Sequence, residues 1–187
     1  MGEAIPKADN TIFPESKYAR IERERKFLLT QLPEPLTTAS EHVQIWDNYI
    51  TNTRLRLRRI RYPKTKEYVV KLTQKYPLEP EDLSRCVITN MYLSAMEYEV
   101  FSVFEGNEIR KNRYPFEFEG HKYGIDVFIG ALSGLIIAEI SFDSDEEMDA
   151  FTPPPFAVKE LTQDIKFTGG KLYDSTSDEL REYLKGK

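Results

Sequence analysis

Charged residues recur at every second position in the segments of this chain that have the pattern of β-strands. Glu22, Glu24 and Lys26 alternate with Arg23 and Arg25 in the first such segment. Because successive side chains of a strand point to opposite faces of a sheet, each set lies on one face. Later segments repeat the spacing with Arg54, Arg56 and Arg58; Lys71, Thr73 and Lys75; Glu139 and Ser141; and Glu160, Thr162 and Asp164.

Two arrangements would accommodate these faces. For any one strand, an outer face with solvated ion pairs is the ordinary arrangement. If every charged face pointed outward, the apolar faces would have to fill one small closed barrel. Aromatic residues make up 12% of the chain, and their bulk favours the opposite arrangement. The charged faces then line a polar tunnel, and helices cover the apolar outer faces.

The hydrophobic periodicity predicts about eight strands and three or four helices. One helix is predicted to begin at an N-cap, Ser94, and a second at a capping box formed by Ser144 and Glu147. The final strand is predicted within the segment 158–167, and a closing helix over 178–184. The first helix has an apolar face made of Leu93, Met96, Val100, Phe101 and Phe104.

The predicted fold class is α+β, mainly β: an eight-stranded antiparallel closed β-tunnel with helices packed outside. The chain has 187 residues, the length of a single domain. We expect a mobile tail over residues 1–17 and one domain over 18–187.

Composition excludes several classes of protein. The net charge of −5 argues against general nucleic-acid binding. The longest uncharged stretch, 127–138, is shorter than the about 20 residues of a spanning helix. The single Cys86 forms no internal disulfide, and two His residues are too few for a His/Cys zinc site. No secretory signal is recognised at the N-terminus, so we expect a cytoplasmic protein without a membrane partner.

A tunnel that contains both acids and bases predicts a particular ligand. Carboxylates suit hard cations such as Mg²⁺ or Mn²⁺. Lys and Arg side chains suit phosphate groups. Together they predict a site for a polyphosphate with a divalent metal.

The segment "ERERK", with Glu22, Glu24 and Lys26, resembles the ExExK signature of the CYTH superfamily, the triphosphate tunnel metalloenzymes. Further blocks follow in the family's order between Arg20 and Leu172. They are "LRLR" at 55–58, Thr73 with Lys75, Ser84 with Arg85, Lys111 with Arg113 and Tyr114, "DVFIG" at 126–130, "GLIIAE" ending at Glu139, and Glu160 with Thr162 and Asp164. The resemblance implies a closed eight-stranded tunnel that binds a triphosphate and a divalent metal.

The resemblance also implies roles for individual residues. Those expected to bind metal are Glu22, Glu24, Glu139 and Glu160, with Glu139 facing the first strand across the tunnel. Those expected to bind phosphate are Lys26, Arg56, Arg58, Lys75, Arg85, Lys111 and Arg113, with Arg54 and Lys71 at the margin of the motif. Asp126 is expected to support and orient a base.

The expected catalytic groups are Glu22, Glu24, Lys111 and Tyr49. Tyr49 occupies the place of a tyrosine that pairs with the Lys111 position in bacterial relatives, although an aromatic at an interface would look the same in sequence. Ser141 stands where many family members carry an acid. Three carboxylates with phosphate oxygens and water can still satisfy Mg²⁺.

The function expected from this resemblance is metal-dependent hydrolysis of inorganic triphosphate or a related small triphosphate. The alternatives are an adenylate cyclase or thiamine triphosphatase of the same superfamily, or a polyphosphate- or nucleotide-binding module without turnover. Trp46 is a candidate for stacking on a substrate ring, and Arg59 and Arg61 for an outer RNA-binding surface. The sequence leaves a homodimer open.

Overall fold

The computed structural model describes residues 19–185. The predicted tail (1–17) and both ends of the predicted domain, residue 18 and residues 186–187, lie outside this range. The strands are β1 (Ala19–Leu29), β2 (Val43–Ile50), β3 (Leu55–Arg61), β4 (Tyr68–Glu79), β5 (Asp82–Leu93), β6 (Gly106–Phe118), β7 (His121–Ile129), β8 (Ile136–Phe142) and β9 (Lys159–Glu160). The helices are α1 (Ala95–Ser102), α2 (Asp145–Ala150), α3 (Gly169–Leu172) and α4 (Ser177–Lys185), with single 3-10 turns η1 (Gly130–Leu132) and η2 (Ile165–Phe167).

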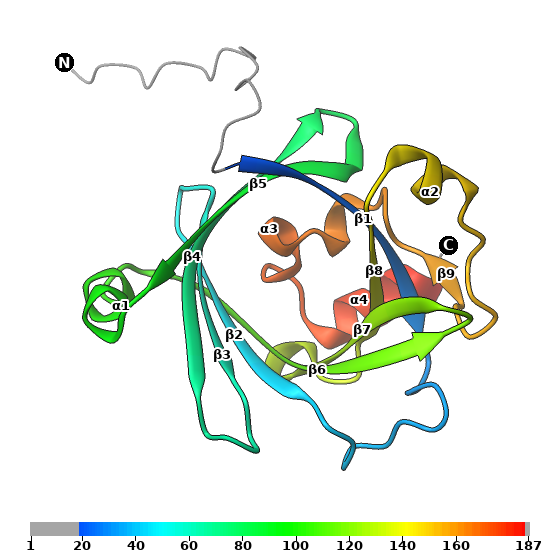
Figure 1. The fold of residues 1–187 in the computed structure, drawn as a ribbon, viewed down its shortest axis with the longest axis horizontal. Coiled ribbons are helices and arrows are strands. Elements are labelled where there is room, and N and C mark those ends of the chain that lie inside the picture. The colour runs from blue at the N-terminus through cyan, green and yellow to red at the C-terminus, as the bar shows by residue number, and fades with distance from the viewer. Residues whose placement is uncertain (1–18, 186–187) are drawn as a thin grey trace.

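Strands β1 to β8 form a closed antiparallel tunnel. The order of hydrogen-bonded neighbours is β5-β4-β3-β2-β6-β7-β8-β1, and β1 also pairs with β5, which closes the ring (Figure 1). Within β1, Ala19–Arg23 pair with β5, and Arg23–Leu29 pair with β8. The predicted eight-stranded closed tunnel is therefore confirmed.

The sequence analysis assigned no strand to residues 43–50, and the final strand that it predicted is longer than the one observed. Trp46 and Tyr49 belong to a strand of their own, β2, which pairs with both β3 and β6. The predicted final strand is wrong, because only its residues Lys159 and Glu160 pair with β1. Asp164 then accepts a hydrogen bond from the backbone N–H of Lys166, which starts the turn η2 instead of continuing a strand.

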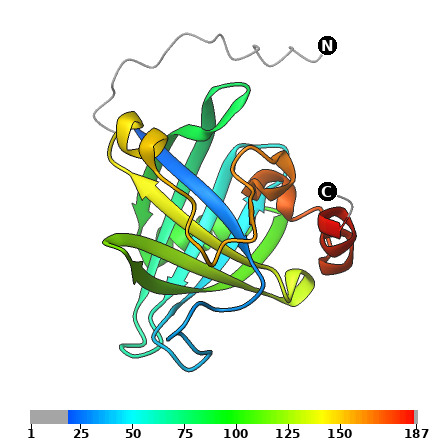
Figure 2. The same cartoon turned by 90° about the vertical axis from the view of Figure 1, so that its right-hand side faces the viewer.

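The predicted helix starts are confirmed at Ser94 and Ser144. Ser94 and Glu97 form a complete capping box at α1. At α2, Ser144 accepts from the N–H of Glu147, whose carboxylate accepts from Asp143 rather than from Ser144. The closing helix is present as α4. In Figure 2, α2 lies beside β1 and β8 at the upper left, and α4 lies at the right-hand edge of the molecule.

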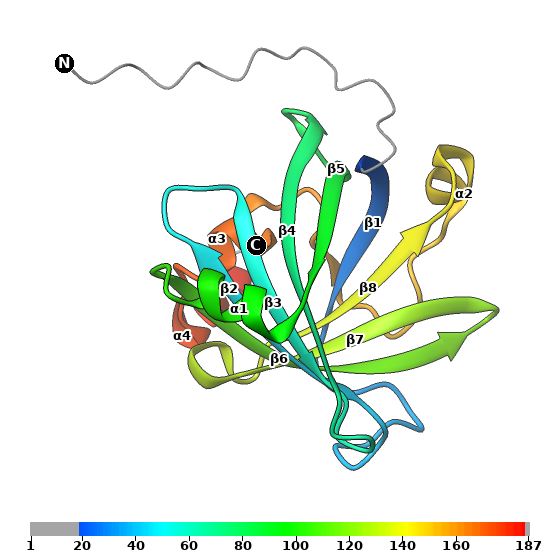
Figure 3. The ribbon, with the colours of Figure 1, turned by 60° about the vertical axis from the view of Figure 1, so that its left-hand side comes forward.

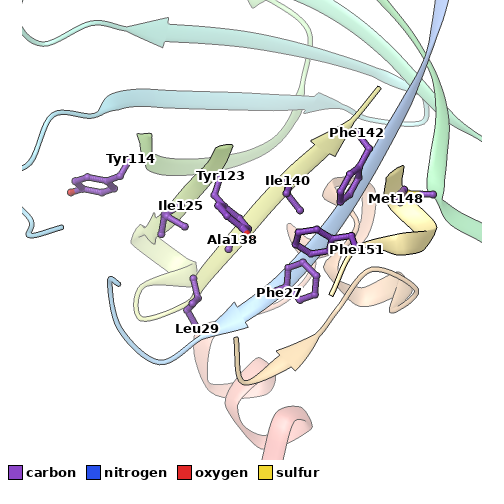
Figure 4. Packing of buried hydrophobic residues seen from close by; sticks show 10 residues of the cluster. All are labelled: Phe27, Leu29, Tyr114, Tyr123, Ile125, Ala138, Ile140, Phe142, Met148 and Phe151. Atoms are coloured by element: carbon purple, nitrogen blue, oxygen red, sulfur yellow. The ribbon is translucent and has the colours of Figure 1, made fainter. Parts of the chain in front are cut away.

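The main hydrophobic core lies on the outer face of the tunnel wall. Phe27 of β1, Ile125 of β7 and Ala138 of β8 are fully buried there. Helix α2 and the segment after it cover them through Met148 and Phe151 (Figure 4). Burying each large side chain contributes about 1.5–3 kcal/mol. The outer face therefore supplies core stability, and the inner face is left for charged side chains, as the sequence predicted.

A second core closes one end of the tunnel. Ile109, Phe128 and Ile137 of the wall pack against Phe167 and Leu172 from η2 and α3. In Figure 1, α3 lies inside the ring of strands. Among residues 19–185, no helix is both long and apolar enough to cross a membrane.

Candidate functional site

The inward faces of the strands enclose a cavity of about 600 Å³. Every strand from β1 to β8 contributes to its lining, because inward residues alternate along each strand. The cavity brings together most of the residues predicted from the sequence: Glu22, Glu24, Lys26, Tyr49, Arg54, Arg56, Arg58, Lys71, Lys75, Lys111, Arg113 and Glu139.

The charge of this cavity is strongly positive. Ten Lys or Arg side chains line it against four Asp or Glu side chains, an excess of six. Asp126, buried directly behind Lys111 and Arg113, lowers the excess to five. Enclosed charges of one sign repel each other and attract a counter-ion into the cleft. The cavity is therefore built for a small ligand with several negative charges.

Each predicted metal-binding carboxylate inside the cavity already has a basic partner. Lys75 Nζ donates to Glu22 Oε2 at 2.6 Å. Lys26 Nζ lies 3.2 Å from Glu24 Oε1, and Arg113 donates to Glu139. Burial tends to raise the pKa values of Glu24 and Glu139, but the neighbouring bases lower both, that of Glu139 well below its usual range. Both carboxylates are therefore ionised at neutral pH.

Glu139 was expected to face β1 across the tunnel, and that prediction is wrong. Strand β8 is the direct neighbour of β1, with Glu139 opposite Lys26 and Ser141 opposite Glu24. Glu139 and Glu24 are thus diagonal neighbours on one wall, at a spacing that long side chains bridge. Glu22 follows two residues away on the same face.

This donor set fits a hard divalent cation in kind, since it offers ionised carboxylate oxygens. Within residues 19–185, no three Asp, Glu, His or Cys side chains form a ready cluster for a metal. Lys75, Lys26 and Arg113 instead pair with Glu22, Glu24 and Glu139. A cation would have to take the place of these bases.

Asp126 holds two of the bases. It is fully buried and accepts from Lys111 Nζ at 2.5 Å and from Arg113 Nε and Nη2 at 2.6 Å each. Gly124 makes room for this arrangement, because a Cβ there would lie 3.1 Å from Arg113 Cδ and Nε. Burial lowers the pKa of Lys111 despite the opposing charges of Asp126 and Glu139. Asp126 thus fixes Lys111 and Arg113 at the cavity wall.

Asp47 is a buried acid of the site that the sequence analysis missed. Arg58 binds it through two hydrogen bonds of 2.6 Å, Nε to Oδ1 and Nη2 to Oδ2. Burial opposes ionisation of Asp47, but Arg58 and Arg56 lower its pKa below the usual range. The alternation of Ile45, Asp47 and Tyr49 in "IWDNY" would have revealed it, once that segment was assigned to a strand.

Arg56 and Lys71 are two further bases beside this pair. The Nε of Arg56 is buried and has no hydrogen-bond partner in the described part of the chain, although Asp47 Oδ1 is 3.6 Å away. Lys71 stands opposite Arg58 on the next strand. Burial, with the charges of Arg58 and Arg56, lowers the pKa of Lys71 to about 8.

Arg85 and Glu160 lie outside the cavity, contrary to prediction. Arg85 points to the outer face of β5, since its neighbours Ser84 and Cys86 have the opposite parity, and it pairs with Asp82 and Asp145. Glu160 is the partner of Arg25, with hydrogen bonds of 2.8 and 2.7 Å. Both motif positions therefore form outer ion pairs.

The predicted pair of Tyr49 and Lys111 is not formed within the described structure. Tyr49 stands opposite Asn107, whereas Lys111 stands opposite Ile45, four residues along the same strand. The Tyr49 ring packs on Tyr173 at 5.8 Å. Its hydroxyl lies where a Cβ on Gly169 would come within 1.9 Å. Tyr49 thus packs against α3 at the cavity and helps to hold this helix there.

The segment 165–172 is a further part of the lining that sequence reasoning missed. It had been assigned in part to a strand, and its 3-10 turn and short helix gave no separate signal. Phe167 and Leu172 close the apolar end of the cavity. Lys171 adds one more base.

Comparisons with known proteins agree with this geometry. No protein-family model matches the chain. An inorganic triphosphatase of Nitrosomonas europaea is 29% identical over 157 residues, which span 81% of this chain and 95% of the relative. An inorganic triphosphatase of Acetivibrio thermocellus is 32% identical over 105 residues, 50% of this chain and 66% of the relative.

Among solved structures, the inorganic triphosphatase NE1496 is similar with a TM-score of 0.56 and 26% identity, covering 82% of this chain and 95% of that one. The closed antiparallel tunnel, with bases and acids on its inner face, is the architecture implied by the sequence resemblance to the triphosphate tunnel metalloenzymes. These relatives confirm the resemblance of this chain to the CYTH superfamily.

Proposed function

We propose that this protein is a divalent-metal-dependent triphosphatase that hydrolyses inorganic triphosphate or a related small triphosphate. The observation that carries the proposal is the enclosed cavity with six more bases than acids among its lining residues. The similarity to two proteins named inorganic triphosphatase supports it. A cytoplasmic location is part of the proposal.

The bases of the wall would hold the phosphate groups. Arg56 has a buried donor without a partner among residues 19–185, and a guanidinium binds phosphate oxygens through parallel hydrogen bonds. Arg58 and Arg113 are held in place by Asp47 and Asp126. Phosphoryl transfer to water passes through a loose transition state, so positioning and charge stabilisation supply most of the catalysis. Fixed guanidinium groups provide both.

Glu22, Glu24 and Glu139 are the residues that would hold Mg²⁺ or Mn²⁺. Such a cation withdraws charge from the phosphate groups that leave. Lys75 and Lys26 pair with two of these acids and could also bind phosphate. If Lys75 and Lys26 turned from Glu22 and Glu24 to phosphate oxygens, they would bind the substrate and leave carboxylate oxygens available for the metal. Without ligands, Lys75 and Lys26 thus neutralise only Glu22 and Glu24, and the excess of bases in the cavity remains.

Two of the alternatives considered from the sequence lose their basis. Trp46 lies on the outer face of β2, under the guanidinium of Arg59 at 4.9 Å, so it cannot stack on a substrate ring in the cavity. Ser141 replaces an acid, yet three carboxylates that suit a metal still line the cavity. A binding module without turnover would therefore have kept an acidic set that phosphate binding alone does not need.

The test is phosphate release from inorganic triphosphate, ATP and thiamine triphosphate, each with Mg²⁺, with Mn²⁺ and with a chelator. The proposal expects turnover with inorganic triphosphate that the chelator abolishes. Tight binding of triphosphate without turnover under any metal would contradict it and favour the binding module. Cyclic AMP formed from ATP, detected in the same reactions, would favour the cyclase.

A further inference from the structure

Helix α1 attaches to the outside of the tunnel by one of its sides only. Tyr98 and Phe101 of α1 pack against a small cluster on the outer face of β3 and β4, which includes the buried Leu57 and Leu72. Figure 3 shows α1 in front of β3, outside the ring of strands. No residue of the helix is buried, so this contact covers the helix only in part.

The other side of α1 is also apolar. Met96, Val100 and Val103 are 78%, 64% and 75% exposed, and their spacing of four and three residues aligns them along the helix. We name these three residues the α1 stripe. A helix that is apolar on both sides is normally covered on both sides. The α1 stripe is therefore expected to be covered by an apolar surface, and residues 19–185 do not provide one.

Acidic side chains flank the α1 stripe. By helical geometry, Glu97 lies on one side of it and Glu99 on the other. Neither carboxylate forms an ion pair with a base of the described residues, although Glu97 accepts two hydrogen bonds from Ser94 in the capping box. Whatever covers the stripe would thus gain from carrying positive charge at its rim.

A surface with that character lies beside the helix on the same molecule. Arg59 points outward from β3, and its guanidinium lies 4.9 Å from the ring of Trp46 and 5.7 Å from that of Tyr68. Arg61 follows on the same face and donates to Gln44. We name Trp46, Arg59, Arg61 and Tyr68 the arginine patch.

The arginines of this patch could accept further ionic partners. Across residues 19–185, neither Arg59 nor Arg61 forms an ion pair with a carboxylate, and the Nε atoms of both are buried without a hydrogen-bond partner. Leu57, Arg59 and Arg61 are successive outward residues of β3, and Leu57 lies beneath α1. The α1 stripe and the arginine patch are therefore neighbours on one continuous face.

We infer that this face binds a second copy of the chain in a two-fold symmetric dimer, in which the α1 stripe of each copy lies on the arginine patch of the other. A two-fold interface requires a surface that is complementary to itself. Two adjacent areas of opposite charge, each with apolar side chains, meet this requirement. Direct pairing of the two α1 helices would instead bring Glu97 and Glu99 against their like-charged copies, which is unfavourable.

The first test is sedimentation velocity of the full chain over a range of concentrations, with Val100→Glu and Val158→Glu compared. Val158 is 59% exposed and lies in the segment before β9, away from this face. The parent should be in monomer–dimer equilibrium. Val100→Glu should weaken dimerisation at least tenfold, because a charge would be buried without a partner, and Val158→Glu should not.

The second test is a charge exchange that also controls for misfolding. Glu99→Arg and Arg59→Glu should each weaken self-association about tenfold or more, since two attractive rim contacts per dimer become repulsive. An equimolar mixture of the two variants should associate within about threefold of the parent, because both contacts are then attractive again. Neither residue lines the cavity, so phosphate release should be unchanged.

Three results would overturn the inference: a parent that stays monomeric at every concentration, a dimer that Val100→Glu leaves intact, or a mixture that shows no recovery. The first would exclude a second copy of the chain as the partner of this face. The other two would place the dimer interface elsewhere.

Discussion

Asp47 and Arg58 form a buried pair of two 2.6 Å hydrogen bonds in the wall of the charged cavity. The pair lies on adjacent strands, with Asp47 opposite Arg58 in the register of β2 and β3. It fixes Arg58 in place, while the Nε of the nearby Arg56 has no hydrogen-bond partner in the described part of the chain. The wall thus combines a fixed base and an available base side by side.

Replacing this acid should be costly for the fold. Asp47→Asn leaves Arg58 buried without its counter-charge and adds to the repulsion among the cavity bases. We expect a loss of about 3–5 kcal/mol in the free energy of unfolding, as for other broken buried pairs. Urea unfolding at pH 7 measures it, with Asp149→Asn as control, because Asp149 is an exposed partner of Arg85.

The same pair predicts how stability depends on acid. Because the pKa of Asp47 is lower in the folded protein than in the unfolded chain, its contribution is present above the unfolded pKa of about 4 and is lost as the pH falls further. The difference in stability between parent and Asp47→Asn should therefore narrow between pH 5 and pH 2. An equal difference at all pH values would contradict this assignment.

Arg56 should act on the phosphates directly. Arg56→Ala removes a charge-assisted contact of about 1.5–3 kcal/mol, so the Kd for inorganic triphosphate should rise about 10- to 150-fold, with or without Mg²⁺. Arg85→Ala is the matched comparison, because Arg85 belongs to the same predicted set but lies outside the cavity. Calorimetric titration should show Arg85→Ala within about twofold of the parent. Equal losses in both variants would contradict the placement of Arg85.

Lys71 should give triphosphate binding a dependence on pH. Its pKa is about 8 without ligand, and a bound polyanion favours the protonated form. Binding therefore takes up a proton above pH 8, and affinity should fall as the pH rises from 7 to 9. In Lys71→Gln, only the titration of triphosphate itself remains. This variant should bind triphosphate more weakly at pH 7, and its affinity should change less between pH 7 and pH 9. Parallel profiles for parent and variant would exclude Lys71 as the cause.

Alternation along the strands accounts for the successful part of the site prediction. Glu22, Glu24, Arg56, Arg58 and Lys75 all lie on long strands, where the parity of a residue determines which way it points. The sheet had to place these charges inside because the other parity carried the side chains that build the outer core. That argument needs only local pattern, and the structure supports it.

The failed predictions depended on information beyond that pattern. Glu160 lies in a strand of two residues, too short for parity to place Thr162 or Asp164. Arg85 was misplaced because the parity of its strand was not used. Cys86 lines the cavity, so its neighbour Arg85 points to the outer face. The position of α3 inside the ring depends on the packing of Phe167 and Leu172 against the wall. The spacing of residues along the sequence does not predict this packing.

The proposed division between acids inside and outside the cavity can be tested in one assay. The initial rate of phosphate release from inorganic triphosphate with Mg²⁺ is measured for the parent, Glu24→Gln and Glu160→Gln. Both variants keep side-chain shape and remove one negative charge. Glu24 lines the cavity beside Lys26, whereas Glu160 is paired with Arg25 outside it.

Glu24→Gln should lower the rate by a factor of about 100 or more, because a hard divalent cation needs the ionised carboxylate, while its metal-free binding of triphosphate stays equal or becomes tighter. Glu160→Gln should retain a rate within about threefold of the parent. A Glu24→Gln variant that hydrolyses triphosphate at the parent rate would contradict the account of the tunnel as a metal-dependent triphosphatase site.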